Sequence, residues 1–190
     1  MNGQNQLTGT EEVTGLDHLD SFFRDTYMNG NIERLPKDLL CTIYCSEEGI
    51  ATDYETGCYL LKLIYEDHQL FLSPPLLAAD RILAEAISRH FGDDNHLDLT
   101  FLTDYELLSI LGKSNKKQVV ALVELLTQPP EQIHVSSTIS GDGILLGARK
   151  IYNKTPLYCG QPFSRMLDGQ TMLAKLKGLE KNYELILTIS

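Results

Sequence analysis

The chain has 190 residues, of which 43% are hydrophobic and 22% are charged, and its formal net charge is −10. This composition is ordinary for a globular protein, and the length suffices for one sizeable core or for two small domains that share an interface. The apolar runs are only a few residues long, which excludes a segment of the roughly 20 residues that cross a bilayer. The polar N-terminus has no basic start and no apolar middle, so we expect no secretory signal and a cytoplasmic protein without membrane partners.

The N-terminal part is expected to be mainly helical, with one ambiguous segment. Residues 1–13 are polar and indicate a flexible tail, after which Thr14 can cap a helix over residues 15–27. A second, short helix can begin at Pro36. Residues 59–73 alternate in a way that favours a β-hairpin over the alternative of a buried helix.

A further helix is predicted over residues 73–90, because Pro74 and the proline after it suit a first helical turn, where their missing N–H groups are not needed. Residues 92–98 then indicate a solvated loop. The predicted fold class is α+β. A helix-rich acidic part over residues 14–98 precedes a second part over residues 99–190, and the two parts are either separate or one continuous domain.

Charge is distributed unevenly along the sequence. Residues 1–110 contain 6 Lys and Arg against 20 Asp and Glu, whereas residues 111–190 contain 10 against 6. The balances are −14 and +4, so a polyanion is expected to bind the second part. The acidic part is expected to serve regulation, self-association or the binding of a basic protein partner.

The cysteines do not have the spacing of a metal site. None of them forms a C-x-x-C pair, which is the usual spacing in structural zinc sites. We therefore expect buried free thiols, with neither a metal nor a disulfide. The four are Cys41, Cys45, Cys58 and Cys159.

Residues 101–130 have the pattern of a helix-turn-helix. Thr103 and Glu106 fit a capping box at the start of a first helix. Gly112 is expected to end that helix with a left-handed cap. Asn115 can cap a second helix only a few residues later, and a short turn with glycine between two helices is the local signature of this motif.

A β-hairpin is predicted directly after these helices. Residues 132–139 and 144–152 have the pattern of strands, and the Gly-Asp-Gly turn at 141–143 tolerates positive φ angles. Residues 102–152 therefore resemble the winged helix-turn-helix superfamily, and they are similar to the winged-helix domains of plasmid replication initiators. A helix and a final strand complete this C-terminal part.

The resemblance implies that the second helix lies in the major groove of double-stranded DNA, with its first turn against the DNA. Lysines of this turn would contact phosphates together with the positive end of the helix dipole. Asn115 and Gln118 would read adenine edges, and basic residues of the return strand would reach the flanking backbone. The implied nucleic-acid-binding residues are Lys113, Asn115, Lys116, Lys117, Gln118, Arg149 and Lys150.

Two acidic residues depart from the pattern of a DNA-binding winged helix. Glu124 is on the outward face of the second helix, where it would lie near phosphates, and Asp142 is at the tip of the wing, where Arg or Lys is common. Winged helices also dock proteins, and both acids fit that use. A second interpretation of Lys116 and Lys117 is simply solvated surface at a helix start.

The chain contains no P-loop, nucleophile-elbow or zinc-protease motif, so we expect no catalytic residue, no cofactor and no enzymatic activity. The leading hypothesis is a nucleic-acid-associated protein, either a DNA-binding regulator or a replication-initiator-like protein, as a monomer or a homodimer. The alternative is an acidic protein-interaction module or inhibitor that presents carboxylates to a basic nucleic-acid-binding partner.

Overall fold

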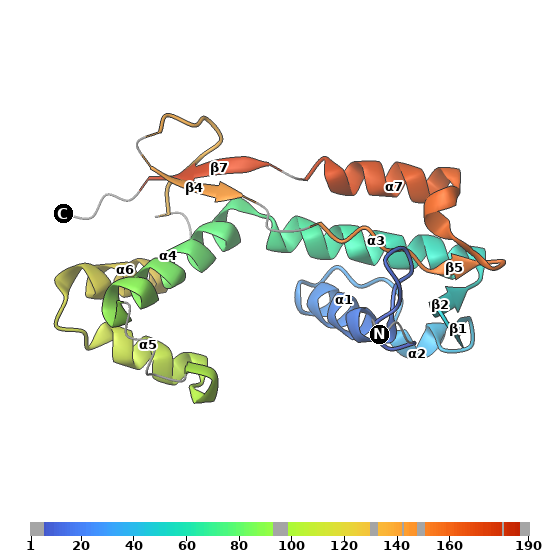
Figure 1. Cartoon of the computed structure of the whole chain (residues 1–190), viewed down its shortest axis with the longest axis horizontal. Helices are drawn as coiled ribbons and strands as arrows, with labels where there is room; N and C mark the ends of the chain where they lie inside the picture. Colours follow the sequence, from blue (N-terminus) through green and yellow to red (C-terminus); the bar gives the residue numbers. More distant parts are fainter. Residues whose placement is uncertain are drawn as a thin grey trace. The chain divides into compact units, whose positions relative to one another are not determined.

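The computed structural model describes residues 6–92, 99–129, 133–141, 143–147, 151–179 and 181–186. Within these residues the protein has an α+β fold with seven α-helices and two small sheets (Figure 1). None of the described helices is both long and apolar enough to cross a membrane. The chain forms two compact units, each built from two stretches of chain. Unit 1 is Met1–Phe71 with Arg149–Glu180, and unit 2 is Leu72–Ala148 with Lys181–Ser190.

The chain first passes from one unit to the other after Phe71, whereas the sequence pattern placed the division after residue 98. Helix α4 (Pro74–Phe91), which the sequence assigned to the acidic part, belongs to unit 2. Unit 1 contains 10 Lys and Arg against 15 Asp and Glu, and unit 2 contains 6 against 11. Each unit therefore carries a formal charge of −5, so the acidic and basic parts of the sequence do not correspond to the two units.

Unit 1 combines helices with a four-stranded sheet. Its elements are α1 (Leu16–Met28), α2 (Pro36–Leu39), β1 (Ile43–Ser46), β2 (Gly49–Thr52), α3 (Tyr54–Phe71), β5 (Leu157–Tyr158), β6 (Gln161–Pro162), the 3-10 helix η3 (Phe163–Arg165) and α7 (Leu167–Lys177). Helix α3 packs against both α1 and α7. The strand order is β1-β2-β5-β6, in which β2 and β5 are parallel and the other pairs are antiparallel.

Helix α3 covers most of the segment for which a β-hairpin was predicted, so the hairpin is wrong and the alternative of a buried helix is confirmed. Leu60, Leu61, Leu63 and Ile64 are each at most 2% exposed. A helix that packs on more than one side needs apolar residues around most of its circumference. This nearly continuous apolar pattern imitates the alternation of strands.

Two glycines allow the core of unit 1 to close around Phe163, whose side chain is fully buried. A Cβ atom at Gly57 of α3 would lie 2.1 Å from the Phe163 ring. A Cβ atom at Gly169 of α7 would lie 1.8 Å from the Phe163 carbonyl oxygen. Glycine at both positions therefore permits α3 and α7 to approach η3 closely.

The end of the predicted flexible tail is part of unit 1. Val13 is 1% exposed. The Thr14 N–H donates to the Thr155 carbonyl at 3.1 Å, and the Thr14 carbonyl accepts from the Ile50 N–H at 2.9 Å. Because Thr14 makes these backbone contacts, it does not cap α1, and Gly15 takes the N-cap position instead.

The cysteines are free thiols, but the prediction that they are buried is wrong for three of the four. Cys41, Cys45 and Cys159 are exposed, and Cys58 in α3 is partly buried. The helix that begins at Pro36 is only four residues long, so Cys41 lies in a turn and Cys45 lies on β1, which is at the edge of its sheet. Cys159 occupies the turn between β5 and β6.

Unit 2 combines three α-helices with a three-stranded antiparallel sheet. Its elements are α4, the 3-10 helix η1 (Leu99–Phe101), α5 (Asp104–Gly112), α6 (Lys117–Thr127), β3 (Val135–Ser136), β4 (Ile144–Gly147) and β7 (Asn182–Leu185). Helix α4 packs along α6 and also contacts α5, β3 and β4. The fully buried side chains of this core are Ala78, Ile82, Ala86, Leu111, Val119, Leu122 and Leu185.

The described strands β3 and β4 do not pair with each other, so the predicted β-hairpin is wrong. Strand β7 lies between β3 and β4 and pairs antiparallel with both, and Figure 1 shows it beside β4. Leu185 is opposite Val135 on one side and opposite Ile144 on the other. The alternating pattern located strands β3, β4 and β7, but such a pattern does not specify which strand is the partner.

Candidate nucleic-acid interface

Helix α5 begins with the predicted capping box. The Thr103 hydroxyl accepts from the Glu106 N–H at 3.3 Å, and the Glu106 carboxylate accepts from the Thr103 N–H at 2.8 Å. At the other end, Gly112 is still helical and Lys113 is the C-cap, with φ −98° and ψ 11°. The expected left-handed cap at Gly112 is therefore wrong, because the chain turns through Lys113 without it.

The first turn of α6 has free backbone donors. Lys116, rather than Asn115, takes the N-cap position, and its side chain does not cap the helix. The Lys116 N–H donates to the Ser114 hydroxyl oxygen at 3.2 Å. Within the described part of the chain, the N–H groups of Lys117 and Gln118 have no acceptor. These two donors lie where a bound anion is stabilised by the positive end of a helix dipole.

Lys116 fastens this turn to the end of α4. Its Nζ donates to the Arg89 carbonyl at 2.7 Å and to the His90 carbonyl at 3.2 Å. The His90 Nδ1 lies 2.8 Å from the Ser114 hydroxyl. A cation that satisfies the last carbonyls of a helix is favourably placed in its dipole. The Lys116 ammonium is therefore held by the protein itself and is not directed at a ligand.

Gln118 is also held by α4. Its side-chain oxygen accepts from Nη1 of Arg89 at 2.7 Å, and Nε of Arg89 donates to Glu85 at 2.9 Å. Reading an adenine edge needs both the oxygen and the nitrogen of the amide. Gln118 would have to leave Arg89 to make that contact.

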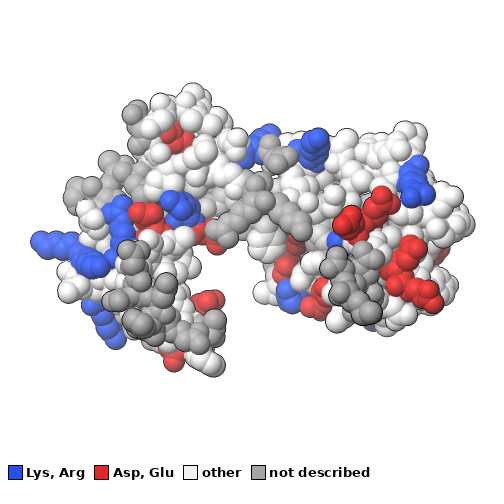
Figure 2. Space-filling model, in the orientation of Figure 1, with Lys and Arg blue, Asp and Glu red and all other residues white. Residues whose placement is uncertain are grey.

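The remaining predicted residues differ in their environment. Lys113, Asn115 and Lys117 are exposed, and neither lysine forms an ion pair within the described residues. Figure 2 shows several Lys and Arg side chains over unit 2, with Asp and Glu side chains among them. Glu124 is exposed on α6. The predictions for Arg149, Lys150 and Asp142 lie outside the described residues.

The loop between β3 and β4, predicted as the tip of a wing, is bound to the sheet by Glu184. This residue of β7 is 1% exposed, and its carboxylate accepts from the N–H groups of Ser140 (2.6 Å), Gly141 (2.9 Å) and Gly143 (2.7 Å). The Ser140 hydroxyl adds a fourth bond at 2.8 Å. The N–H groups of Ser140 and Gly143 lower the pKa of Glu184 from 4.5 to about 2. The carboxylate therefore keeps this loop against its own sheet.

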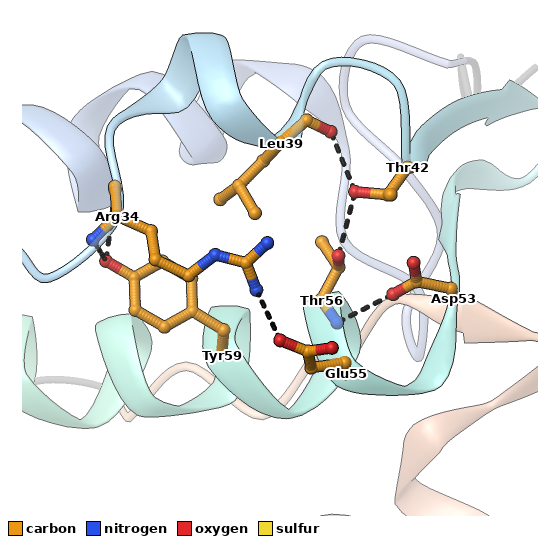
Figure 3. A network of polar contacts seen from close by, with 7 residues as sticks. All are labelled: Arg34, Leu39, Thr42, Asp53, Glu55, Thr56 and Tyr59. Carbon is orange, nitrogen blue, oxygen red and sulfur yellow. Dashed lines mark hydrogen bonds and ion pairs between the residues drawn. The ribbon is translucent and has the colours of Figure 1, made fainter.

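Unit 1 contains a polar network with a structural role (Figure 3). The Tyr59 hydroxyl accepts from the Arg34 N–H at 2.9 Å, and the Arg34 guanidinium pairs with Glu55 at 3.0 Å. The hydroxyls of Thr42 and Thr56 lie 2.8 Å apart. These bonds connect α3 to the two segments that flank α2, one before it and one after it. They do not place a nucleophile beside a base.

Asp67 and His68 are the most buried titratable pair of unit 1, each 8% exposed. The His68 Nδ1 lies 2.8 Å from the Ile64 carbonyl, and its Nε2 accepts from the Tyr152 N–H at 3.0 Å. One nitrogen donates and the other accepts, so His68 is neutral. Burial, and then the charge of Asp25, raise the pKa of Asp67 to about 6. Among the described residues, no group of three or more His, Cys, Asp or Glu side chains could hold a metal ion.

Sequence reasoning missed two residues that shape this region. Arg89 lies in the last turn of α4, where backbone carbonyls have no partner within the helix. This position was the only signal in the sequence that its carbonyl would accept a bond from another residue. Nothing in the sequence around Glu184 indicated that its carboxylate accepts bonds from a loop more than forty residues earlier.

Comparisons with known proteins place the chain in no family, because it matches no protein-family model, no curated protein and no solved structure. The winged helix-turn-helix resemblance is not tested by these comparisons and stays a prediction, although β3 and β4 do not form the hairpin on which it partly depended.

Proposed function

We propose that this is a non-enzymatic nucleic-acid-associated protein that holds the phosphate backbone of double-stranded DNA with the turn between α5 and α6. The observation that carries the proposal is the first turn of α6. There, the Lys117 and Gln118 N–H groups have no acceptor in the described part of the chain, and the side chains of Asn115 and Lys117 are exposed beside them.

The local charge of this turn supports an anionic ligand. Phosphate oxygens are well matched to N–H groups at a helix start, and a nearby ammonium adds a charge-assisted contact. Lys116 contributes by neutralising the carbonyl end of α4, which would otherwise repel a phosphate beside α6. The two helix ends and their lysines therefore form one favourable site.

The contacts favour the DNA backbone over the bases. Gln118 is engaged with Arg89, and Glu184 holds the loop that would be the tip of a wing. Phosphate contacts position a protein but carry no sequence information. Because unit 2 carries a net charge of −5, its long-range interaction with DNA is repulsive, and only the local contacts at the α6 turn favour binding. We therefore expect binding no tighter than roughly 10⁻⁴ to 10⁻⁶ M, the usual range for non-specific complexes.

Fluorescence anisotropy of a labelled DNA duplex tests the proposal at two salt concentrations. Lys117→Glu should abolish measurable binding, because it replaces the exposed ammonium and places a carboxylate beside the phosphate site. Lys175→Glu is the matched control, since Lys175 is an exposed lysine on α7 of unit 1. Equal binding by the two variants, or no binding by the wild type at low salt, contradicts the proposal.

A cleft in unit 1 favours a second function, the binding of a basic protein segment. The cleft has a volume of about 490 Å³ and is lined by Glu11, Glu12 and Glu48, together with Arg165. Arg165 lies 3.6 Å from Glu12, which leaves the other two carboxylates for a cationic partner. A labelled oligolysine peptide should bind the wild type and lose affinity in Glu11→Gln/Glu48→Gln, but not in the unit 2 control Glu124→Gln. Equal affinity for all three proteins contradicts this function.

A further inference from the structure

Helix α5 presents an exposed face on which no described residue of unit 2 packs. Phe101 and Tyr105 are 84% and 82% exposed, which makes them the most exposed large hydrophobic side chains of the described residues. Leu111 is fully buried on the opposite side of α5. Tyr105, Ser109 and Gly112 recur at helical spacing, so they form one stripe along this side of α5, in which Tyr105 and Gly112 are exposed and Ser109 is half-buried.

This stripe changes in size from one end to the other. The aromatic ring of Tyr105 stands near the start of α5, and small residues follow it. A Cβ atom at Gly112 would meet only the Val123 side chain, at 3.8 Å, so the surface over Gly112 is open. A bulky end and an open end on the same helix face are complementary when two such helices run in opposite directions.

The charges along α5 have the same self-complementary order. Glu106 lies in the first turn, and Lys113 lies at the C-cap. The capping box uses only Oε2 of Glu106, and Oε1 has no partner within the described residues. Lys113 is exposed. The helix therefore has an available carboxylate at one end and an available ammonium at the other.

We propose that α5 is a self-association surface, on which it packs antiparallel against α5 of a second copy of this chain, with the two-fold axis near Ser109. Tyr105 and Lys113 are each four positions from Ser109, or about 6 Å along the axis. Antiparallel packing thus sets the Tyr105 ring over Gly112 of the second copy. It also brings the Lys113 ammonium of that copy within reach of the Tyr105 ring face and of the Glu106 carboxylate.

The surface is small compared with the interfaces of stable dimers. Helix α5 has nine residues and is about 13 Å long. A contact of two such helices, extended by Phe101, falls at or below the roughly 1,200 Å² of a standard stable interface. The dimer is therefore weak and reversible, and it forms in the micromolar range or above. Lys117 lies outside the stripe, so the phosphate site of each copy stays open.

Sedimentation velocity of the full chain without nucleic acid tests this inference, from low micromolar to several hundred micromolar protein. The wild type should show a monomer–dimer equilibrium. Tyr105→Ala should raise the dissociation constant at least tenfold, whereas Tyr27→Ala, an exposed tyrosine of α1, should leave it unchanged. Because the assay contains no DNA, its outcome is independent of the proposed phosphate site.

A charge exchange then identifies the pairing partner. Lys113→Glu alone should weaken the dimer, since it sets two carboxylates against each other, and Lys113→Glu/Glu106→Lys in the same chain should restore it. Circular dichroism confirms that each variant is folded. A wild type that stays monomeric at every concentration overturns the inference. So does a dimer whose affinity is unchanged in both Tyr105→Ala and Lys113→Glu.

Discussion

Leu122→Ala should destabilise unit 2 by about 3 kcal/mol, within the roughly 2–5 kcal/mol that such truncations cost. Leu122 is 0% exposed on α6 and belongs to the cluster that contains Ile82 of α4 and Leu111 of α5. The substitution removes a buried isopropyl group and leaves a cavity between three helices, which limits how far the site can relax. A change of this size shifts the unfolding equilibrium by a factor of roughly 150.

Chemical denaturation followed by circular dichroism measures the loss, and hydrogen exchange with mass spectrometry locates it. Peptides of α4 and α6 should exchange faster in Leu122→Ala, while peptides of α3 should keep their protection, because α3 belongs to unit 1. Glu124→Ala, an exposed position on α6, should change the free energy of unfolding by no more than about 0.5 kcal/mol. A loss below about 1 kcal/mol in Leu122→Ala refutes the reasoning, because a packed core cannot absorb the cavity so cheaply.

Three further predictions concern titration and thiol chemistry. The folded pKa of Glu184 is about 2, below its ordinary 4.5, so its contribution to stability is full above pH 4.5 and is lost as the pH falls toward 2. Glu184→Gln should therefore reduce the slope of the unfolding free energy against pH in that window. Asp67 has the opposite sign: its folded pKa is about 6 against an ordinary 3.8, so the wild type should gain stability relative to Asp67→Asn as the pH falls from 7 toward 4. In a thiol-reagent assay of the native protein, Cys58 should react more slowly than the exposed cysteines, because burial, and then the charge of Asp168, raise the pKa of its thiol. A uniform rate for all thiols would contradict this.

Local signals in the sequence predicted the helices well. The proline pair before α4 and the Thr103–Glu106 box before α5 depend only on residues within one turn, and both helices begin where these signals place them. Helix α1 was also predicted, but its N-cap is Gly15 and not Thr14, because the Thr14 backbone bonds to the distant Thr155. Signals that a few neighbouring residues satisfy can be read from the sequence alone.

Pairing across long distances could not be predicted. The alternation of β3 and β4 was visible, yet both pair with β7, which follows them by some forty residues. The acidic residues 1–110 and the mildly basic residues 111–190 do not correspond to the two units, because each unit is built from two stretches of chain. At the candidate site, lysines were expected at the start of α6, but the contacts of Lys116 and Gln118 with Arg89 depend on how α4 packs against α6.

The most direct test of the phosphate site is a titration of the isotopically labelled protein with a short DNA duplex, followed by backbone amide chemical shifts. We expect the amide signals of Lys117 and Gln118 to move first and furthest, with a downfield proton shift, because their N–H groups gain phosphate acceptors. The signals of α7 should stay in place. Unchanged Lys117 and Gln118 amides at saturating DNA, or shifts confined to another surface, would contradict the account.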